Sequence, residues 1–358
     1  MNKNLKVLND LIIEAIQNGF FPGGNYCLVE SNNIYLNTFG DRAIFPKIEK
    51  NNLDTIYDMA SCTKVLVTTT SIFLLMEAGK LRIYDSVKKY IPEFKYDNIT
   101  IYDLMTHTSG FAAGIPWSDD VTTKEEVLKR IFSLEIKYEK NTKIVYSDIG
   151  FILLGLIIEN VSKKTLSDFA DLNIFKPLEM NNSSFNPKNK GICAPTEIRN
   201  DIITRGEVHD ERAYVLGGVA GHAGLFSTVE DVSHFIQMVL NDGKYKEIQF
   251  LSKATIDLMF TPQVKELQGV NLVGEQRGLG WIIKGSFCSA GDLVSEQTIL
   301  HTGFTGTNIF IDRVNEVGFS LLTNRVHPTR NNIKIIALRA KLGNYIISHF
   351  GKGNKDEI

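Results

Sequence analysis

The sequence predicts an α/β (α+β) protein with one antiparallel sheet, covered by the two terminal helices, and an inserted helical region. Strand-like segments occur at 25–31 and 34–40, near the start of the chain. Alternating apolar and polar residues return at 299–325, and helical periodicity dominates the chain between these segments. Strands at both ends of a chain with helices between them are most simply joined in one sheet.

The expected elements follow in order. Residues 1–20 have apolar side chains at helical spacing, and the two segments after them flank Asn32-Asn33, which predicts a hairpin. The apolar run at 61–78 predicts a helix that ends at Gly79. Further helices are expected from capping residues and periodicity, with starts at Thr100, Thr123, Asp148, Thr165 and Ser227, the last with Glu230 at capping-box spacing, and a closing helix at 331–350.

We therefore expect a single domain over residues 1–358. Its sheet part would comprise 1–79 and 211–350, and its mainly helical part 80–210. The chain is long enough for two domains, but it contains neither internal repeats nor a low-complexity linker.

Composition excludes several classes of function. The net charge of −2 provides no cationic surface for nucleic acid or anionic lipid. The longest apolar run, 149–158, is shorter than the roughly 20 residues of a membrane span, and the first helix lacks the apolar core and cleavage site of a signal peptide. A cytoplasmic location is therefore expected. The four cysteines are widely spaced, which predicts free thiols rather than disulfides or a zinc site.

Ser61 and Lys64 are the first candidate site residues. A lysine three residues after a serine lies on the same helix face, about 5–6 Å away between Cβ atoms, and could take the serine proton. Ser86 and Lys89 have the same S-x-x-K spacing in a charged, solvated stretch, so the spacing is weak by itself. The alternative is a capping serine with a surface lysine.

Two further motifs extend this site. Tyr146-Ser147-Asp148 precedes a predicted helix, and His301-Thr302-Gly303 lies on a predicted strand beside a turn. With Ser61-x-x-Lys64, they resemble the three motifs of the serine β-lactamase and penicillin-binding-protein superfamily. The leading tyrosine resembles the branch of class C β-lactamases, DD-peptidases, D-aminopeptidases and esterases. The stretches 104–111 and 217–228 are also similar to that branch, and the resemblance covers about residues 20 to 345.

The resemblance implies a role for each residue. Ser61 would be the nucleophile that forms an acyl-enzyme, and Lys64 and Tyr146 would share its proton. The backbone N–H groups of Ser61 and Phe304 would form the oxyanion hole. Asp148, His301, Thr302, Gly303 and Phe304 would contact substrate, and a side chain at Gly303 would crowd the approaching substrate. The family fold has the site between sheet and helical region, and no metal or organic cofactor is implied.

Two departures from the family pattern bear on the substrate. His301 stands where β-lactamases usually have a lysine, so a charge for a substrate carboxylate would be partial and confined to a pH below about 6.5, provided that its pKa is ordinary. Asp148 stands where asparagine is usual. Its carboxylate could bind a substrate ammonium group, or it could keep Lys64 protonated and leave Tyr146 as the base. Alternatively, it could cap the following helix.

These departures favour an esterase or D-peptidase-like hydrolase over an efficient β-lactamase. The substrate would be a small molecule or peptide: an ester, a D-amino-acid amide, a muropeptide fragment or a β-lactam. The alternatives are a non-catalytic penicillin-binding or regulatory protein of the same fold and, less favoured, a metal-dependent hydrolase using His209, Asp210 and His222. Cys62 is expected to be a buried apolar residue rather than the nucleophile. The acyl group and the oligomeric state stay open.

Overall fold

The computed structural model describes residues 3–31, 33–114, 121–199, 201–264, 274 and 276–353. Its largest element is an antiparallel sheet with the strand order β11-β12-β13-β14-β15-β1-β2-β3. The strands span Gln276–Arg277, Ile282–Ile283, Thr298–Thr302, Asn308–Asp312, Val317–Thr323, Gly23–Glu30, Asn33–Ala43 and Glu49–Lys50, in that order. Strands β1 and β2 form the expected hairpin, and β1 also pairs with β15, so the two ends of the sequence meet in mid-sheet. The predicted fold class is confirmed.

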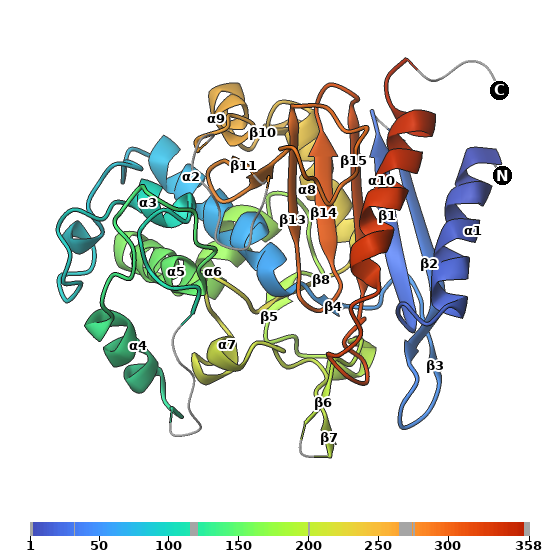
Figure 1. Ribbon diagram of the computed structural model, residues 1–358, viewed down its shortest axis with the longest axis horizontal. Coiled ribbons are helices and arrows are strands. Elements are labelled where there is room, and N and C mark those ends of the chain that lie inside the picture. Colours follow the sequence, from blue (N-terminus) through green and yellow to red (C-terminus); the bar gives the residue numbers. More distant parts are fainter. Residues whose placement is uncertain are drawn as a thin grey trace.

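Helices cover both faces of this sheet. Helices α1 (Lys3–Gln17) and α10 (Ile335–Phe350) lie side by side on one face (Figure 1), and α8 (Val229–Leu240) packs on the other. Successive residues of a strand point to opposite faces, so Tyr26 and Leu28 join the core beneath α1 and α10. Cys27 and Val29 join the larger core on the α8 side.

The inserted helical region packs around one apolar helix, α5 (Asp148–Ser162), which contacts α2 (Thr70–Glu77), α3 (Ile101–Met105) and α6 (Leu166–Ala170). Thr100, Thr123 and Thr165 cap α3, α4 (Lys124–Ser133) and α6 as predicted. Remaining elements are α7 (Glu211–Val215), α9 (Lys253–Met259), and the short strands β4 (Tyr57–Asp58), β5 (Ser184–Phe185), β6 (Ile198–Arg199), β7 (Ile202–Ile203), β8 (Leu225–Ser227), β9 (Lys244–Tyr245) and β10 (Ile248–Gln249). The division at residues 79 and 211 stays a prediction, although α2 packs against α5 across it.

Two local predictions are wrong. The single helix expected over 61–78 consists of a 3₁₀ turn (Ala60–Cys62), a π-helical segment (Lys64–Thr69) and then α2. A threonine hydroxyl competes for a backbone carbonyl here, since Thr70 Oγ1 donates to Val65 O at 2.9 Å. The cap of α8 is Thr228 rather than Ser227, because Ser227 is still part of β8.

No helix in the described ranges combines the length and apolar character required to cross a membrane. The four cysteines are free, as predicted.

Candidate active site

Ser61 lies in a sharp turn between β4 and the π-helical segment. The preceding residue, Ala60, has a φ of 46°, a conformation that costs a non-glycine residue energy. Three hydrogen bonds hold this turn: Ala60 N donates to Asp58 Oδ1 at 2.8 Å, Thr63 Oγ1 donates to Ala60 O at 2.6 Å, and Thr305 Oγ1 donates to Asp58 O at 2.7 Å. The turn therefore ties Ser61 to the sheet side of the molecule.

Lys64 is fully buried and lies among three oxygen atoms. Its Nζ is 3.1 Å from Ser61 Oγ, 3.0 Å from the His222 carbonyl oxygen and 2.8 Å from Asp148 Oδ1. Burial alone would lower the pKa of Lys64, but the charge of Asp148 and its hydrogen bond with Lys64 outweigh burial and raise that pKa above its usual value. Lys64 is therefore an ammonium at neutral pH, and the alternative of a surface lysine beside a capping serine is wrong.

A glycine-rich loop brings the His222 carbonyl to Lys64. A Cβ atom at Gly221 would lie 2.0 Å from the Phe151 carbonyl oxygen of α5. Only glycine therefore lets this loop lie directly on the helix.

Tyr146 completes the group around Ser61. Lys64 Nζ lies 4.9 Å from the centroid of its ring, and the Arg277 guanidinium lies 5.6 Å from the same ring. Burial raises the pKa of Tyr146, and Asp148 acts in the same direction, whereas the Lys64 charge and hydrogen bonds with Lys64 and Ser61 lower it; the net direction is upward. Tyr146 is therefore a neutral phenol in the resting protein.

Asp148 is the first residue of α5, and Ser147 occupies the N-cap position. The Asp148 carboxylate contacts Lys64 at 2.8 Å and Arg212 Nη1 at 3.5 Å. The structure thus places Asp148 as the counter-ion of Lys64 rather than as the cap of the helix. Its negative charge is already shared by two cations, which leaves less of it for the amine of a substrate.

His301 is buried on β13, and its Nδ1 lies 3.0 Å from the Thr302 carbonyl oxygen. Burial holds the pKa of His301 well below its usual value, and the charges of Lys64 and Arg277 act in the same direction. A partial positive charge on His301 below pH 6.5 required an ordinary pKa, and the pKa of His301 is not ordinary. His301 is a neutral side chain near Tyr146, with 6.2 Å between the ring centroids.

Thr302, Gly303 and Phe304 follow His301 at the end of β13. A Cβ atom at Gly303 would lie 2.0 Å from Thr307 Oγ1 and 2.6 Å from the Met59 carbonyl oxygen. The requirement for glycine here comes from packing against the backbone before Ser61, which corrects the expectation that a side chain would obstruct the substrate. The Phe304 ring is half exposed and stacks on His209, at 5.6 Å between centroids.

His107 lies in the stretch 104–111, which resembles the family, and packs beside Tyr146. Its ring lies 4.8 Å from the Tyr146 ring, and its Nδ1 accepts a hydrogen bond from Ser147 N at 3.1 Å. Its carbonyl oxygen accepts another from Val145 N at 2.9 Å. His107 therefore fixes the loop that carries Tyr146, and the T-H-T-S-G stretch around it was the available signal.

Two cavities meet at Ser61 and Phe304. The larger, about 400 Å³, is also lined by Tyr146, His301 and three arginines, Arg277, Arg325 and Arg339. The smaller, about 150 Å³, is lined by Ala60, His209, Asp210, Glu211, Ala223 and Arg330 in addition to Ser61 and Phe304. We call the larger cavity the arginine pocket. No motif in the sequence pointed to its arginines.

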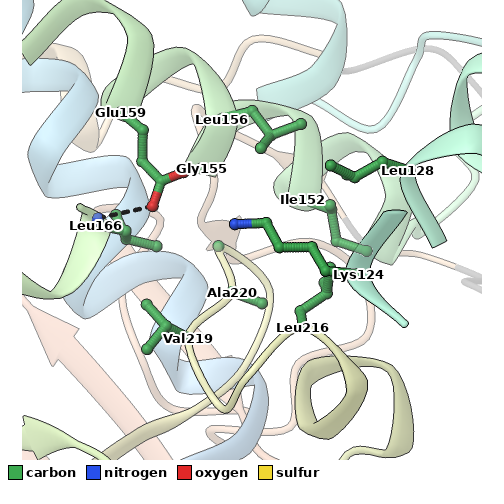
Figure 2. Close-up of a pocket in the computed structure, with 11 residues that line it drawn as sticks. Lys124, Leu128, Ile152, Gly155, Leu156, Glu159, Leu166, Leu216, Val219 and Ala220 are labelled. Carbon is green, nitrogen blue, oxygen red and sulfur yellow. Dashed lines mark hydrogen bonds between the residues drawn. The ribbon is translucent and has the colours of Figure 1, made fainter. Parts of the chain in front are cut away.

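A third cavity lies away from these residues, between α4, α5 and the loop at 216–221 (Figure 2). The amine of Lys124 points into it, and a Glu159 side-chain oxygen accepts a hydrogen bond from Leu166 N at 3.0 Å at its edge. Its volume of about 20 Å³ is enough for little more than a water molecule.

The metal alternative involves a different set of residues from the expected one. Asp148, Asp210 and His222 offer ligand atoms within 4.8 Å of one another, whereas His209 turns away to Glu197 at 3.2 Å. Asp148 in this group already contacts two cations, Lys64 and Arg212. A divalent cation would have to displace or repel both.

Cys62 lies next to Ser61 in the chain but faces the opposite direction. Its Sγ contacts Thr307 Oγ1 at 3.7 Å and the His301 carbonyl oxygen at 3.9 Å, and burial raises its pKa to about 11. A buried thiol with a raised pKa is a poor nucleophile, as the sequence led us to expect.

Comparisons with known proteins agree with this geometry. The family model described as "Beta-lactamase" matches residues 8–344. The "N-acetylmuramyl-L-alanine amidase" of Bacillus subtilis (strain 168) is 31% identical, with 91% of this chain and 82% of that protein covered. An Escherichia coli (strain K12) protein described as "Putative D-alanyl-D-alanine carboxypeptidase" is 33% identical, with 90% and 83% covered. The unliganded structure of simvastatin synthase (LovD) from Aspergillus terreus shares the fold, with a TM-score of 0.78, 17% identity, and 99% and 100% covered. The chain therefore belongs to the β-lactamase family and is a serine hydrolase of the β-lactamase and penicillin-binding-protein superfamily.

Proposed function

We propose that this hydrolase forms an acyl-enzyme on Ser61, with Tyr146 as its general base. The observation that carries the proposal is the position of Lys64 Nζ, 3.1 Å from Ser61 Oγ and 2.8 Å from Asp148 Oδ1. A buried ammonium paired with a carboxylate cannot accept a proton, so Lys64 acts as a fixed positive charge. Tyr146 must first lose its phenol proton to solvent, and the Lys64 charge makes this loss easier than burial alone would allow. The resulting phenolate is the form that can take the Ser61 proton.

The reaction then proceeds in two halves. Ser61 Oγ attacks the carbonyl carbon while its proton passes to the Tyr146 phenolate, and the N–H groups of Ser61 and Phe304 stabilise the oxyanion. Tyr146 returns the proton to the leaving group as the carbon–leaving-group bond breaks. In the second half, water gives a proton to Tyr146 and attacks the acyl-enzyme. Tyr146 then gives that proton to Ser61 Oγ as the bond between Oγ and the acyl carbon breaks, which releases the acid and regenerates Ser61.

The substrate class follows from the departures at His301 and Asp148. A neutral His301 does not supply the charge that a lysine would, so a substrate carboxylate would have to be bound by other cations of the site. We propose an ester or D-amino-acid peptide or amide as substrate, with slow turnover of β-lactams at most. The names of the relatives, an amidase and a D-alanyl-D-alanine carboxypeptidase, support a cell-wall peptide as one member of this class. We further propose that the substrate is small and diffusible and that catalysis takes place in the cytoplasm.

Covalent labelling tests this function. A fluorophosphonate should add to the wild-type protein and fail to add to Ser61→Ala, as measured by intact mass and peptide mapping. Ser86→Ala is the matched control, because Ser86 has the same spacing to Lys89, but Lys89 is more than half exposed and pairs with Asp85. Labelling that persists in Ser61→Ala, or that maps to Cys62, would refute the proposal.

Measurements of product release separate this proposal from its two alternatives, a non-catalytic binding protein and a metal-dependent hydrolase. A non-catalytic binding protein would be labelled once by a penicillin or ester, so an ester would release at most one equivalent of its alcohol and no free acid. A metal-dependent hydrolase would lose activity with a chelator and would still turn over substrate in Ser61→Ala. Product release that depends on Ser61 and resists the chelator supports the proposal against both.

A further inference from the structure

We propose that the arginine pocket is the leaving-group subsite and that it takes a group that is both apolar and anionic, such as a bulky amino acid or hydroxy acid with a free carboxylate. This inference rests on the proposed function and names the substrate class of the same site. It depends on which cavity holds the leaving group, on the charge of that cavity, and on its size and apolar wall.

The position of Tyr146 indicates which of the two cavities holds the leaving group. The residue that returns a proton to the leaving atom must lie within hydrogen-bond reach of it. Tyr146 lines the arginine pocket and is not among the described residues that line the smaller cavity. The leaving group therefore occupies the arginine pocket, and the acyl group extends toward the smaller cavity, which His209, Asp210 and Glu211 make polar.

The arginine pocket is positively charged. Arg277, Arg325 and Arg339 line it, and none of its described lining residues is an aspartate or glutamate. Arg339 Nη2 donates to two neutral acceptors, the carbonyl oxygens of Thr307 at 3.0 Å and Gly303 at 3.4 Å. Its Nε is buried and has no hydrogen-bond partner within the described chain.

Two of these arginines are partly or largely buried, and the hydrogen bonds that they donate go to neutral carbonyl oxygens, although the Glu197 charge acts on Arg325. Burial lowers the pKa of Arg339 to about 10, and it also lowers the pKa of Arg325, which donates to the Phe304 carbonyl oxygen at 2.8 Å. Positive charge that is desolvated and paired only with neutral carbonyls is stabilised when a carboxylate enters. The pocket therefore selects an anion although His301 is neutral.

The rest of the pocket is large and apolar. Its volume of about 400 Å³ lies in the range of pockets that enclose whole ligands. Ile282 and Ile335 line its wall, and Ile333 and Ile336 line it with side chains that are 63% and 56% exposed. Exposed isoleucines beside a catalytic serine gain most when an apolar group covers them. A leaving group with only a methyl side chain would leave them uncovered.

A matched set of ester substrates tests both properties. Phenylacetyl esters of lactic acid, 2-hydroxy-4-methylpentanoic acid and 3-phenyllactic acid, in both enantiomers, differ only in the leaving group, and each is paired with its carboxamide. We expect kcat/KM to be about tenfold or more higher for the acids than for the carboxamides. We also expect it to rise about tenfold from the lactate to the two larger esters.

Variants assign these preferences to the pocket. Arg339→Gln should reduce the acid-to-carboxamide ratio towards one, and Arg339→Lys should retain much of it. Ile336→Ser should reduce the preference for the larger esters. Arg313→Gln and Ile48→Ser, which change residues outside the pocket, should alter neither ratio. Both readouts are ratios within one variant, so partial loss of folded protein cancels.

Each outcome decides between the two proposals. An acid-to-carboxamide ratio near one in the wild type, or one that is unchanged in Arg339→Gln, would overturn the anion subsite. Equal rates for lactate and phenyllactate esters would overturn the apolar subsite. If either result is found while activity still depends on Ser61, the acyl-enzyme proposal stands and only the subsite is refuted. Turnover of these esters by Ser61→Ala would refute the proposed function itself.

Discussion

Replacing Asp148 with asparagine tests how the charge of Lys64 is set. Asparagine keeps the size of the side chain and removes its charge. The Lys64 ammonium would then be buried with only neutral oxygen partners, those of Ser61, His222 and Asn at position 148. Arg212, which shares Asp148 at 3.5 Å, would remain nearby as a repulsive cation.

The size of the effect follows from the distance. Lys64 Nζ and Asp148 Oδ1 are 2.8 Å apart. With the two charges centred about 4 Å apart, the attraction is about 4 kcal/mol at an effective dielectric constant near 20. Since about 1.4 kcal/mol corresponds to a factor of ten, loss of the Lys64 proton becomes roughly a thousandfold easier. Burial and the Arg212 charge act in the same direction, and the pKa of Tyr146 also falls, because Asp148 raises it.

The assay is the pH dependence of kcat/KM with a p-nitrophenyl ester. In the wild type, the pKa values of Lys64 and Tyr146 are both raised, so the base is largely protonated and kcat/KM should climb steadily from pH 7 to pH 9. In Asp148→Asn, the pKa of Tyr146 falls because Asp148 no longer raises it, and the same rise should occur at a lower pH.

The matched control is Asp171→Asn, which removes a pair of the same length, 2.7 Å to Lys176, on the surface where both side chains are exposed. Its profile should match the wild type, because exposed pairs are worth little. If the Asp148→Asn profile also superimposes on the wild type, Asp148 does not set the charge of Lys64 and the assignment of Tyr146 as base loses its physical basis.

Three further predictions concern the same site. Tyr146→Phe and Lys64→Met should each remove most of the turnover, and the double variant should be little worse than either, since residues that act as a unit are not additive; additive losses in kcat/KM would show that they act separately. His301→Lys should lower the melting temperature, because Lys64 and Arg277 already place positive charge there, and a rise would contradict the neutral His301. Gly221→Ala should lower the free energy of unfolding, measured with denaturant, by about 1–3 kcal/mol. Gly191→Ala should lower it much less, because the nearest atom to an added Cβ there is a side-chain oxygen at 3.3 Å. Equal losses in the two variants would show that the loop contact with α5 is not tight.

Local sequence signals were enough to predict the strands near both ends of the chain, most helix starts and the three motifs. Strand alternation and capping threonines are such signals, and the hairpin of β1 and β2 and the starts at Thr100, Thr123 and Thr165 needed no knowledge of distant residues. The turn was expected at Asn32-Asn33, but Asn33 already lies in β2 and pairs with Glu30, and residue 32 lies outside the described residues. The order of the motifs and the likeness of the flanking stretches were sufficient to indicate the family. The segment expected as one α-helix at 61–78 is helical but changes from 3₁₀ to π to α geometry, a change that its apolar periodicity did not indicate.

Only the tertiary structure decided the electrostatics of the site. The charge of Lys64 depends on Asp148, and the neutrality of His301 depends on burial and on Lys64 and Arg277, none of which the local sequence reports. Arg277 on β11, Arg325 after β15 and Arg339 on α10 line the same pocket as His301, although they lie far apart in the sequence. A pKa is set by the charges and the solvent within a few ångströms, and these neighbours are fixed only when distant segments of the chain pack together.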